Sequence, residues 1–298
     1  MHKILLELVK MQTIFFALVA FLTWGIGDVF GTSATRKIGG YSTTLWFLVL
    51  QTIIFGALGI FFINNLTNLT LSLFTLNTVL GFLGAIGLIA FYEALRIGNA
   101  SLVGTISASF AAVTVILSII FFKESPTFAQ SIAILIVFIG LIVSTLDFKE
   151  LKGRKLYLNK GVLLSLIPMV TWGIYWTFIK IPVKQIGWFW PGYISSAVSL
   201  PAVFAYIYLK KIKIQSINTK NAFLPLVANA VLLGIGALSY NHAVDTNLTT
   251  IVAPIAGAYP ALFAILAWFA FRDPIKKVEI MGIIITLTGI VLLSAFSI

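Results

Sequence analysis

A single carboxylate, Asp28, lies inside the first long apolar run of the sequence. It follows Trp24 by four residues, so the two side chains share one face if this run is a helix. A carboxylate within a membrane helix costs roughly 2.5–3.5 kcal/mol on insertion scales, and it therefore needs a partner or a wet cavity. Two interpretations stay open: an interfacial residue capped by Thr32 or nearby backbone, or the counter-charge for a cationic solute or coupling ion.

Two further pairs of ionisable residues share a spacing of three. Glu93 precedes Arg96 and His242 precedes Asp245, and a separation of 149 residues maps one pair onto the other. Each pair is interpreted either as a self-neutralising anchor at the membrane interface or as a gate. Because a histidine ordinarily titrates at about pH 6.5, His242 is also a candidate for proton relay and ion coupling.

Aromatic residues make up 14% of the chain, and some of them lie close to these polar positions. An aromatic cavity with one acid would suit an amine or aromatic solute through cation–π contacts. The alternative is that these side chains face lipid or pack the core. The candidate solute-binding aromatics are Trp24, Trp172, Tyr175, Trp176 and Tyr240.

The composition predicts that these residues belong to an integral membrane protein. The 298 residues are 60% hydrophobic and 10% charged, whereas a soluble domain carries about 25% charged residues. The net charge of +11 comes from Lys and Arg in short loops, which indicates membrane orientation rather than nucleic-acid binding. The absence of cysteine excludes disulfides and thiolate metal sites, and we expect no metal and no cofactor.

Ten continuous apolar runs are long enough to cross a bilayer as helices, which need roughly 20 residues each. Because the runs are continuous rather than short and alternating, they do not resemble barrel strands. The expected fold class is therefore all-α, with ten transmembrane helices. They are predicted near 11–32, 41–63, 74–96, 99–122, 127–146, 161–182, 188–209, 221–243, 248–271 and 277–297.

The two halves of the chain repeat each other. Trp24-Gly25 recurs as Trp172-Gly173, and from the third helix on a separation of 149 pairs Gly87 with Gly236 and Phe110 with Tyr259. We divide the chain into a first five-helix repeat at 1–146, a basic connecting loop at 147–160 and a second repeat at 161–298. Because five is odd, the second repeat must be inverted in the bilayer. Inverted repeats around a central cavity are a recurring plan of secondary transporters.

Together these residues resemble the EamA-type branch of the drug/metabolite transporter superfamily. The resemblance covers nearly the whole chain and includes the segments ALRIGNASLVG at 94–104, FFKES at 121–125, AVDTNLTTIVAP at 243–254 and FRDP at 271–274. One departure is Ala111, where the second half has Pro260, and it predicts that the first half bends less at this point.

The resemblance implies a ten-helix carrier of small organic metabolites, such as amino acids, amines or nucleosides. Because the sequence contains no P-loop, we expect a gradient-driven, alternating-access transporter without catalytic residues. The expected partners are a small-molecule solute, the lipid bilayer and a coupling proton or cation. A homodimer stays open, whereas nucleic acid is not expected.

The charges and the resemblance disagree about orientation in the cell membrane. Of the 20 Lys and Arg residues, five lie on the side of the termini and fifteen on the other side. The positive-inside rule therefore places both termini outside. The resemblance implies that both termini are cytoplasmic.

Two rival functions remain open. The segment Gly25-Ile26-Gly27-Asp28 and the triplet Pro260-Ala261-Leu262 match patterns of intramembrane aspartyl proteases, with Asp245 as the second carboxylate. The order of these motifs along the chain is wrong for that class, and the internal repeat would be left unexplained. The other rival is a non-transporting membrane scaffold or lipid-binding protein, which would need no central cavity.

Overall fold

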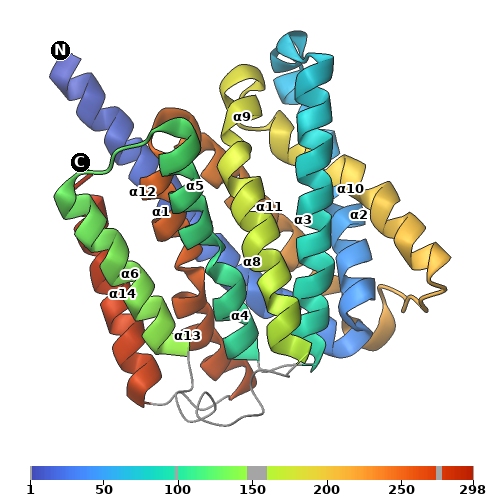
Figure 1. Ribbon diagram of the computed structural model, residues 1–298. Helices are drawn as coiled ribbons and strands as arrows, with labels where there is room; N and C mark the ends of the chain where they lie inside the picture. The colour runs from blue at the N-terminus through green and yellow to red at the C-terminus, as the bar shows by residue number, and fades with distance from the viewer. Residues whose placement is uncertain (1, 98–99, 146–159, 273–276, 298) are drawn as a thin grey trace.

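A computed structural model describes residues 2–97, 100–145, 160–272 and 277–297, and its regular elements within these ranges are helices (Figure 1). The predicted basic loop at 147–160 lies outside the described residues except for Lys160. The helices of the first half are α1 (His2–Ile38), α2 (Gly40–Leu58), η1 (Gly59–Asn68), α3 (Leu71–Ile97), α4 (Ala100–Ala108), α5 (Phe110–Phe122) and α6 (Phe128–Thr145).

The second half repeats this series of helices. Its helices are α8 (Lys160–Phe178), α9 (Lys180–Ile186), α10 (Trp190–Leu209), η3 (Thr219–Asn221), α11 (Phe223–Thr246), α12 (Thr249–Gly257), α13 (Tyr259–Phe271) and α14 (Lys277–Ala295). Among the described residues, eight helices are long and apolar enough to cross a membrane, and the shorter apolar helices Ile106–Phe122 and Phe128–Ser144 bring the number to ten. The prediction of an all-α fold with ten spans is confirmed.

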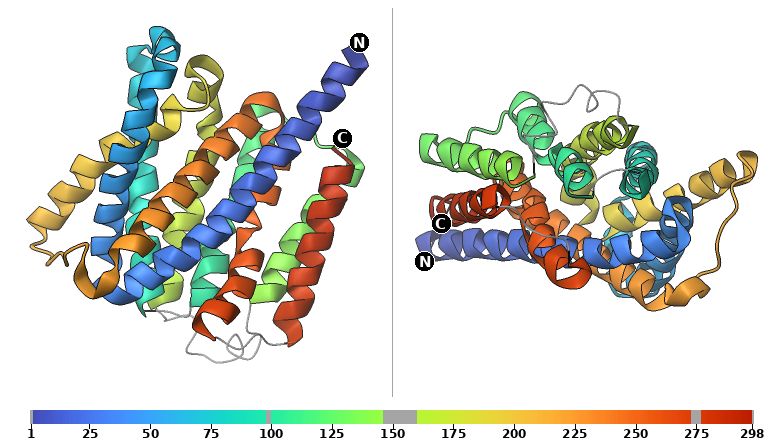
Figure 2. Two further views of the ribbon diagram at one scale, coloured as in Figure 1. Left: turned by 180° about the vertical axis from the view of Figure 1, so that it is seen from behind. Right: turned by 90° about the horizontal axis from the view of Figure 1, so that it is seen from below.

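The two halves run in opposite directions. In Figure 1, α1 descends from the N-terminus, whereas its counterpart α8 ascends from the lower end of the bundle. Both termini lie at the upper end, which we call the termini end, and the lower end we call the loop end. The packing follows the inversion, because α1 lies against α11 while their counterparts α8 and α3 lie against each other. Figure 2 shows the α1–α11 pair from behind, and the fifth helices, α6 and α14, also pack side by side.

Paired glycines explain why these helices approach so closely. A methyl group at Gly87 of α3 would overlap the indole nitrogen of Trp172, and one at Gly236 of α11 would overlap that of Trp24. These two contacts are equivalent in the repeat. Each half therefore accommodates the tryptophan of the other half over a glycine, as small residues do in membrane helix packing.

Both repeats contain a broken helix, so the first half is interrupted although it has Ala111 where the second has Pro260, and whether it bends less stays a prediction. The break lies at Ser109 in the first half (ψ −3°) and at Ala258 in the second (ψ 1°). A methyl group at Gly257 would lie 2.5 Å from the side chain of Ala111, so the two broken helices cross at this point. The crossing explains why a small residue rather than proline stands at Ala111.

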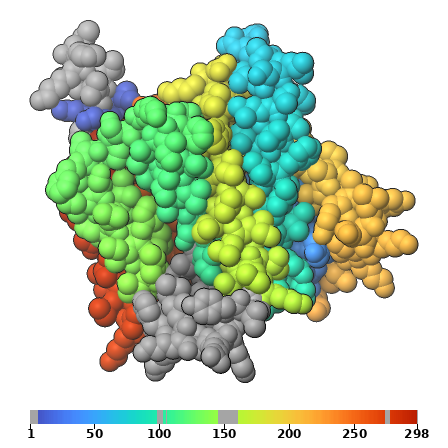
Figure 3. Space-filling view, viewed as in Figure 1, coloured from blue at the N-terminus to red at the C-terminus, as the bar shows by residue number. Residues whose placement is uncertain are grey.

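The outer surface is apolar. Leu71, Phe128 and Phe61 are about four-fifths exposed, and exposed side chains of this kind continue along α2, α3, α5 and α6. Figure 3 shows α3, α8, α5 and α6 side by side on one face of the molecule. Hydrocarbon rather than water is the appropriate surrounding for such a face.

Candidate solute cavity

A cavity lies between α1, α2, α3, α8, α10 and α11, and its empty volume, counted together with the space at its opening, is about 1040 Å³. Glycines on α3 and α11, including Gly84 and Gly234, leave room for it. Five of the predicted solute-binding residues line this cavity: Trp24, Asp28, Trp172, Tyr175 and Trp176.

Tyr240, the sixth predicted residue, lies behind this lining and is fully buried. Its ring stacks on Trp24 with centroids 5.8 Å apart and contacts Trp176 at 4.7 Å, and its hydroxyl donates to the backbone oxygen of Trp176 at 3.1 Å. Tyr240 thus positions the two tryptophans. That these six residues bind a solute stays a prediction.

Asp28 is buried, with 8% of its surface exposed, and its hydrogen-bond partner was not foreseen. The hydroxyl of Tyr259, at the start of α13, donates to its carboxylate. The expected cap by Thr32 was wrong, because the Thr32 hydroxyl has no hydrogen-bond partner among the described residues. Asn229 braces the same stretch of α1 by donating to the backbone oxygen of Gly27 at 2.9 Å and accepting from the hydroxyl of Tyr92.

The cavity has one charged side chain among the described residues that line it, and this side chain is Asp28. Within the described parts of the chain, no Lys, Arg or His forms an ion pair with it. A buried carboxylate without a cation is costly in a low-dielectric site, so a positively charged ligand would be stabilised next to it.

Sequence reasoning missed a second polar group in the cavity. Ser196 of α10 donates to the side-chain oxygen of Gln51 on α2 at 3.1 Å, and both residues line the cavity. Neither residue carries a charge, and their helices are far apart in sequence, so no spacing pointed to them. The repeat could have indicated Tyr259, because it occupies the position of Phe110 in the first repeat and differs from it by a hydroxyl group. This hydroxyl is the group that donates to Asp28.

The two predicted gate pairs differ in the structure. Glu93 accepts from Arg96 at 3.0 Å (Nε) and 2.5 Å (Nη2) at the end of α3, with the arginine about half exposed. His242 and Asp245 do not form the equivalent pair. Asp245 lies 3.6 Å from Lys184 of α9 instead.

His242 stacks on Phe16 with ring centroids 4.1 Å apart, and its Nδ1 is buried without a hydrogen-bond partner among the described residues. The rival dyad of aspartates is also not formed. Asp28 bonds to Tyr259, whereas Asp245 pairs with Lys184.

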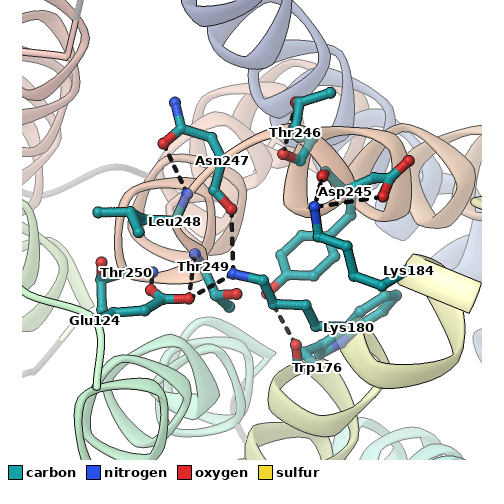
Figure 4. A network of polar contacts seen from close by, with 12 residues as sticks. Glu124, Trp176, Lys180, Lys184, Asp245, Thr246, Asn247, Leu248, Thr249 and Thr250 are labelled. Atoms are coloured by element: carbon teal, nitrogen blue, oxygen red, sulfur yellow. Dashed lines mark hydrogen bonds and ion pairs between the residues drawn. The ribbon is translucent and has the colours of Figure 1, made fainter. Parts of the chain in front are cut away.

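Another buried carboxylate, Glu124, lies just after α5 at the termini end (Figure 4). It accepts from Lys180 Nζ at 2.7 Å and from the backbone N–H groups of Thr249 and Thr250 at 3.0 and 2.8 Å. We call these four residues the Glu124 network. Burial alone would raise the pKa of Glu124, but the hydrogen bonds from Lys180 and the two backbone groups outweigh it and hold this pKa below its usual value.

Comparisons with known proteins agree with this architecture. The EamA-like transporter family model matches residues 11–146 and 159–295. An uncharacterized protein of Methanocaldococcus jannaschii is 29% identical over 138 residues, which are 46% of this chain and 98% of that protein. A protein of known crystal structure shares the fold, with a TM-score of 0.74 over 94% of this chain and 95% of its own at 14% identity. Because the family model matches both halves, the chain belongs to the EamA-like transporter family.

Proposed function

We propose that this protein is a gradient-driven, alternating-access transporter of a small organic cation, an amine with an apolar or aromatic body. The observation that carries the proposal is Asp28, a buried carboxylate without a cationic partner among the described residues that line the cavity. A transported amine would supply the missing positive charge at each passage.

The aromatic lining supports the same class of solute. Trp24 lies 5.0 Å from Trp176 and 5.9 Å from Tyr259, measured between ring centroids, so several ring faces surround the approach to Asp28. A desolvated ammonium group over such rings gains about 2 kcal/mol from cation–π attraction. An anionic solute would meet both the carboxylate and the negative ring faces, and both would repel it.

The inverted packing supports the alternating-access part of the proposal. Equivalent helix pairs, α1–α11 and α3–α8, surround the cavity, so exchanging the roles of the two halves gives a second state of similar packing energy. A membrane scaffold would need neither this cavity nor a buried acid. The sequence has no P-loop, so a solute or ion gradient would supply the energy.

The proposal is tested by a melting-temperature screen of the purified protein against amines, their neutral isosteres and matched carboxylates. A ligand that binds only the folded state raises the melting temperature by mass action. We expect the amines to raise it and Asp28→Asn to abolish both this shift and uptake into proteoliposomes. The asparagine is nearly isosteric with the aspartate, so the packing of α1 is preserved while the charge is lost.

Glu93→Gln is the matched control, because it neutralises a carboxylate that already has a cationic partner outside the cavity. It should leave the amine-induced shift unchanged. Stabilisation by the carboxylates alone, or full amine uptake by Asp28→Asn, would contradict the proposal.

A further inference from the structure

The Glu124 network connects the two repeats at one end of the molecule. Glu124 belongs to the first repeat, whereas Lys180, Thr249 and Thr250 belong to the second. Both carboxylate oxygens are used, one by Thr249 and Lys180 and the other by Thr250. Figure 4 shows the carboxylate between the start of α12 and the ammonium group, which also donates to the backbone oxygen of Asn247 at 3.2 Å.

The network satisfies groups that would otherwise be unpaired. The first N–H groups of a helix have no partner within that helix, and they carry a partial positive charge. For α12 a side chain from the other repeat provides the acceptor. Separating the repeats at this end would leave a carboxylate, an ammonium and two backbone N–H groups without these partners.

The other end of the molecule lacks an equivalent charge pair in its sequence. The separation of 148 that relates Trp24 to Trp172 places Thr32 at the position equivalent to Lys180. A threonine cannot form an ion pair with an acid. The hydroxyl of Thr32 is also buried without a partner among the described residues. At that end the repeats meet through other groups, such as Arg36, whose guanidinium lies over the ring of Phe271 at 4.3 Å.

The network also lies close to the cavity. Lys180 follows the cavity-lining Trp176 by four residues, and the backbone between α8 and α9 stays close to helical at Ile179 (φ −58°, ψ −23°). The ammonium group is therefore about one helical turn from the aromatic wall.

We propose that Glu124 and Lys180 are positioning residues of the transport cycle, which hold the termini end closed and must release α12 each time that end opens. This inference rests on the proposed alternating access. Neither residue touches the solute. They set the balance between the state open to the termini end and the state closed there.

Cysteine accessibility tests this inference, because the chain contains no cysteine of its own. Ser196→Cys introduces one thiol into the cavity lining with little change in volume. The full-length protein in liposomes is labelled with a membrane-impermeant maleimide from either side, and a C-terminal tag identifies the side of the termini. Glu124→Gln should raise labelling from the termini side by about tenfold or more, because each hydrogen bond lost from a buried charge costs at least 1.4 kcal/mol, the equivalent of tenfold.

Two further variants separate this effect from a general loss of structure. Lys180→Gln removes the ion pair but keeps the hydrogen bonds from Glu124 to the start of α12, so it should give a smaller rise in labelling from the termini side. If Glu124→Gln does not fold, Lys180→Gln is the variant that tests the inference. Glu93→Gln breaks an ion pair within α3 at the loop end, so it should not raise labelling from the termini side.

The outcomes distinguish the inference from the function on which it rests. A thiol that is reachable from both sides, but with equal labelling in the parent and in both network variants, would overturn the role of Glu124 and leave alternating access intact. A thiol reachable from one side alone in every variant would overturn alternating access itself. A rise on the termini side that also occurs in Glu93→Gln would show a nonspecific loosening and would contradict the inference.

Discussion

At the scale of single residues, two buried carboxylates, Asp28 and Glu124, have opposite surroundings. Asp28 faces the cavity and accepts a hydrogen bond from Tyr259, whereas Glu124 is fully paired with an ammonium group and two backbone N–H groups. The first has no cationic partner among the described residues, which is why we propose that it binds the positive charge of a transported solute. The second is suited to hold two parts of the chain together.

The pairing of Glu124 predicts how stability depends on pH. Because the folded pKa is below the unfolded value of about 4.5, the stabilisation is fully present above that pH and is lost as pH falls through the folded pKa. Glu124→Gln should cost about 2 kcal/mol near neutral pH. The difference in melting temperature between the two proteins should shrink on acidification, as followed by thermal melts in detergent.

Glu124→Asp is the matched comparison, because it keeps a titrating carboxylate on a shorter side chain. It should retain the acid sensitivity that Glu124→Gln lacks. A wild-type advantage that stays constant down to the lowest pH would show that the charge of Glu124 does not stabilise the fold.

The sequence pointed to Asp28 because an acid in an apolar run is conspicuous. It did not single out Glu124, which lies in the segment FFKES at 121–125, because this acid follows the apolar run instead of interrupting it. The pairing of His242 with Asp245 failed for a related reason. Spacing along one helix cannot show that Lys184, on another helix, lies nearer to the acid.

At the scale of elements, glycines determine where helices meet. Three of them lie in the contact between the fifth helices, α6 and α14, where a methyl group would overlap the facing backbone: Gly140, Gly282 and Gly289. The repeat, with its separation of 149, makes Gly140 and Gly289 equivalent. It did not predict which helices they bring together, because contacts between halves leave no periodic signal in the sequence.

This contact predicts that replacing glycine by alanine lowers the stability of the fold, which is the opposite of the usual effect within a helix. Within a helix, Gly→Ala normally stabilises by up to about 1 kcal/mol. Gly282→Ala should instead destabilise by about 1–3 kcal/mol, because its methyl group would overlap the backbone at Ser144 and force the helices apart. Thermal melting of the purified variant measures the effect.

Gly104→Ala is the control, since a methyl group there meets no atom of the described residues within 4 Å. This variant should be neutral or slightly stabilised. Equal melting temperatures for the two variants would mean that α6 and α14 can separate at no cost.

At the scale of the whole molecule, the ten spans and their inversion followed from composition and from the repeat. The breaks in the helices did not, because no proline marks the break at Ser109 and the crossing of Gly257 with Ala111 leaves no signal in the sequence. The cavity was expected between the repeats, but its shape depends on how Trp24 and Trp172 pack over Gly236 and Gly87.

Orientation in the membrane is a prediction at the same scale. The side of the loop end carries fifteen of the 20 Lys and Arg residues, so the positive-inside rule predicts that both termini are outside. Fusions of alkaline phosphatase and of green fluorescent protein to the C-terminus measure this. We expect the phosphatase fusion to be active and the green fluorescent protein fusion to be non-fluorescent. An inactive phosphatase with a fluorescent fusion would favour cytoplasmic termini, the orientation that the family resemblance implies.

The acid of the cavity comes from one repeat alone. Its counterpart in the other repeat, at the separation of 148, is Trp176. The first repeat therefore contributes a carboxylate to the cavity lining where the second contributes an indole ring. An ancestor assembled from two identical copies of the first half would have carried a carboxylate on each wall. For the proposed amine cargo, one carboxylate matches one ammonium group, and the second charge of a diamine would lie among aromatic side chains without a counter-charge from the described lining.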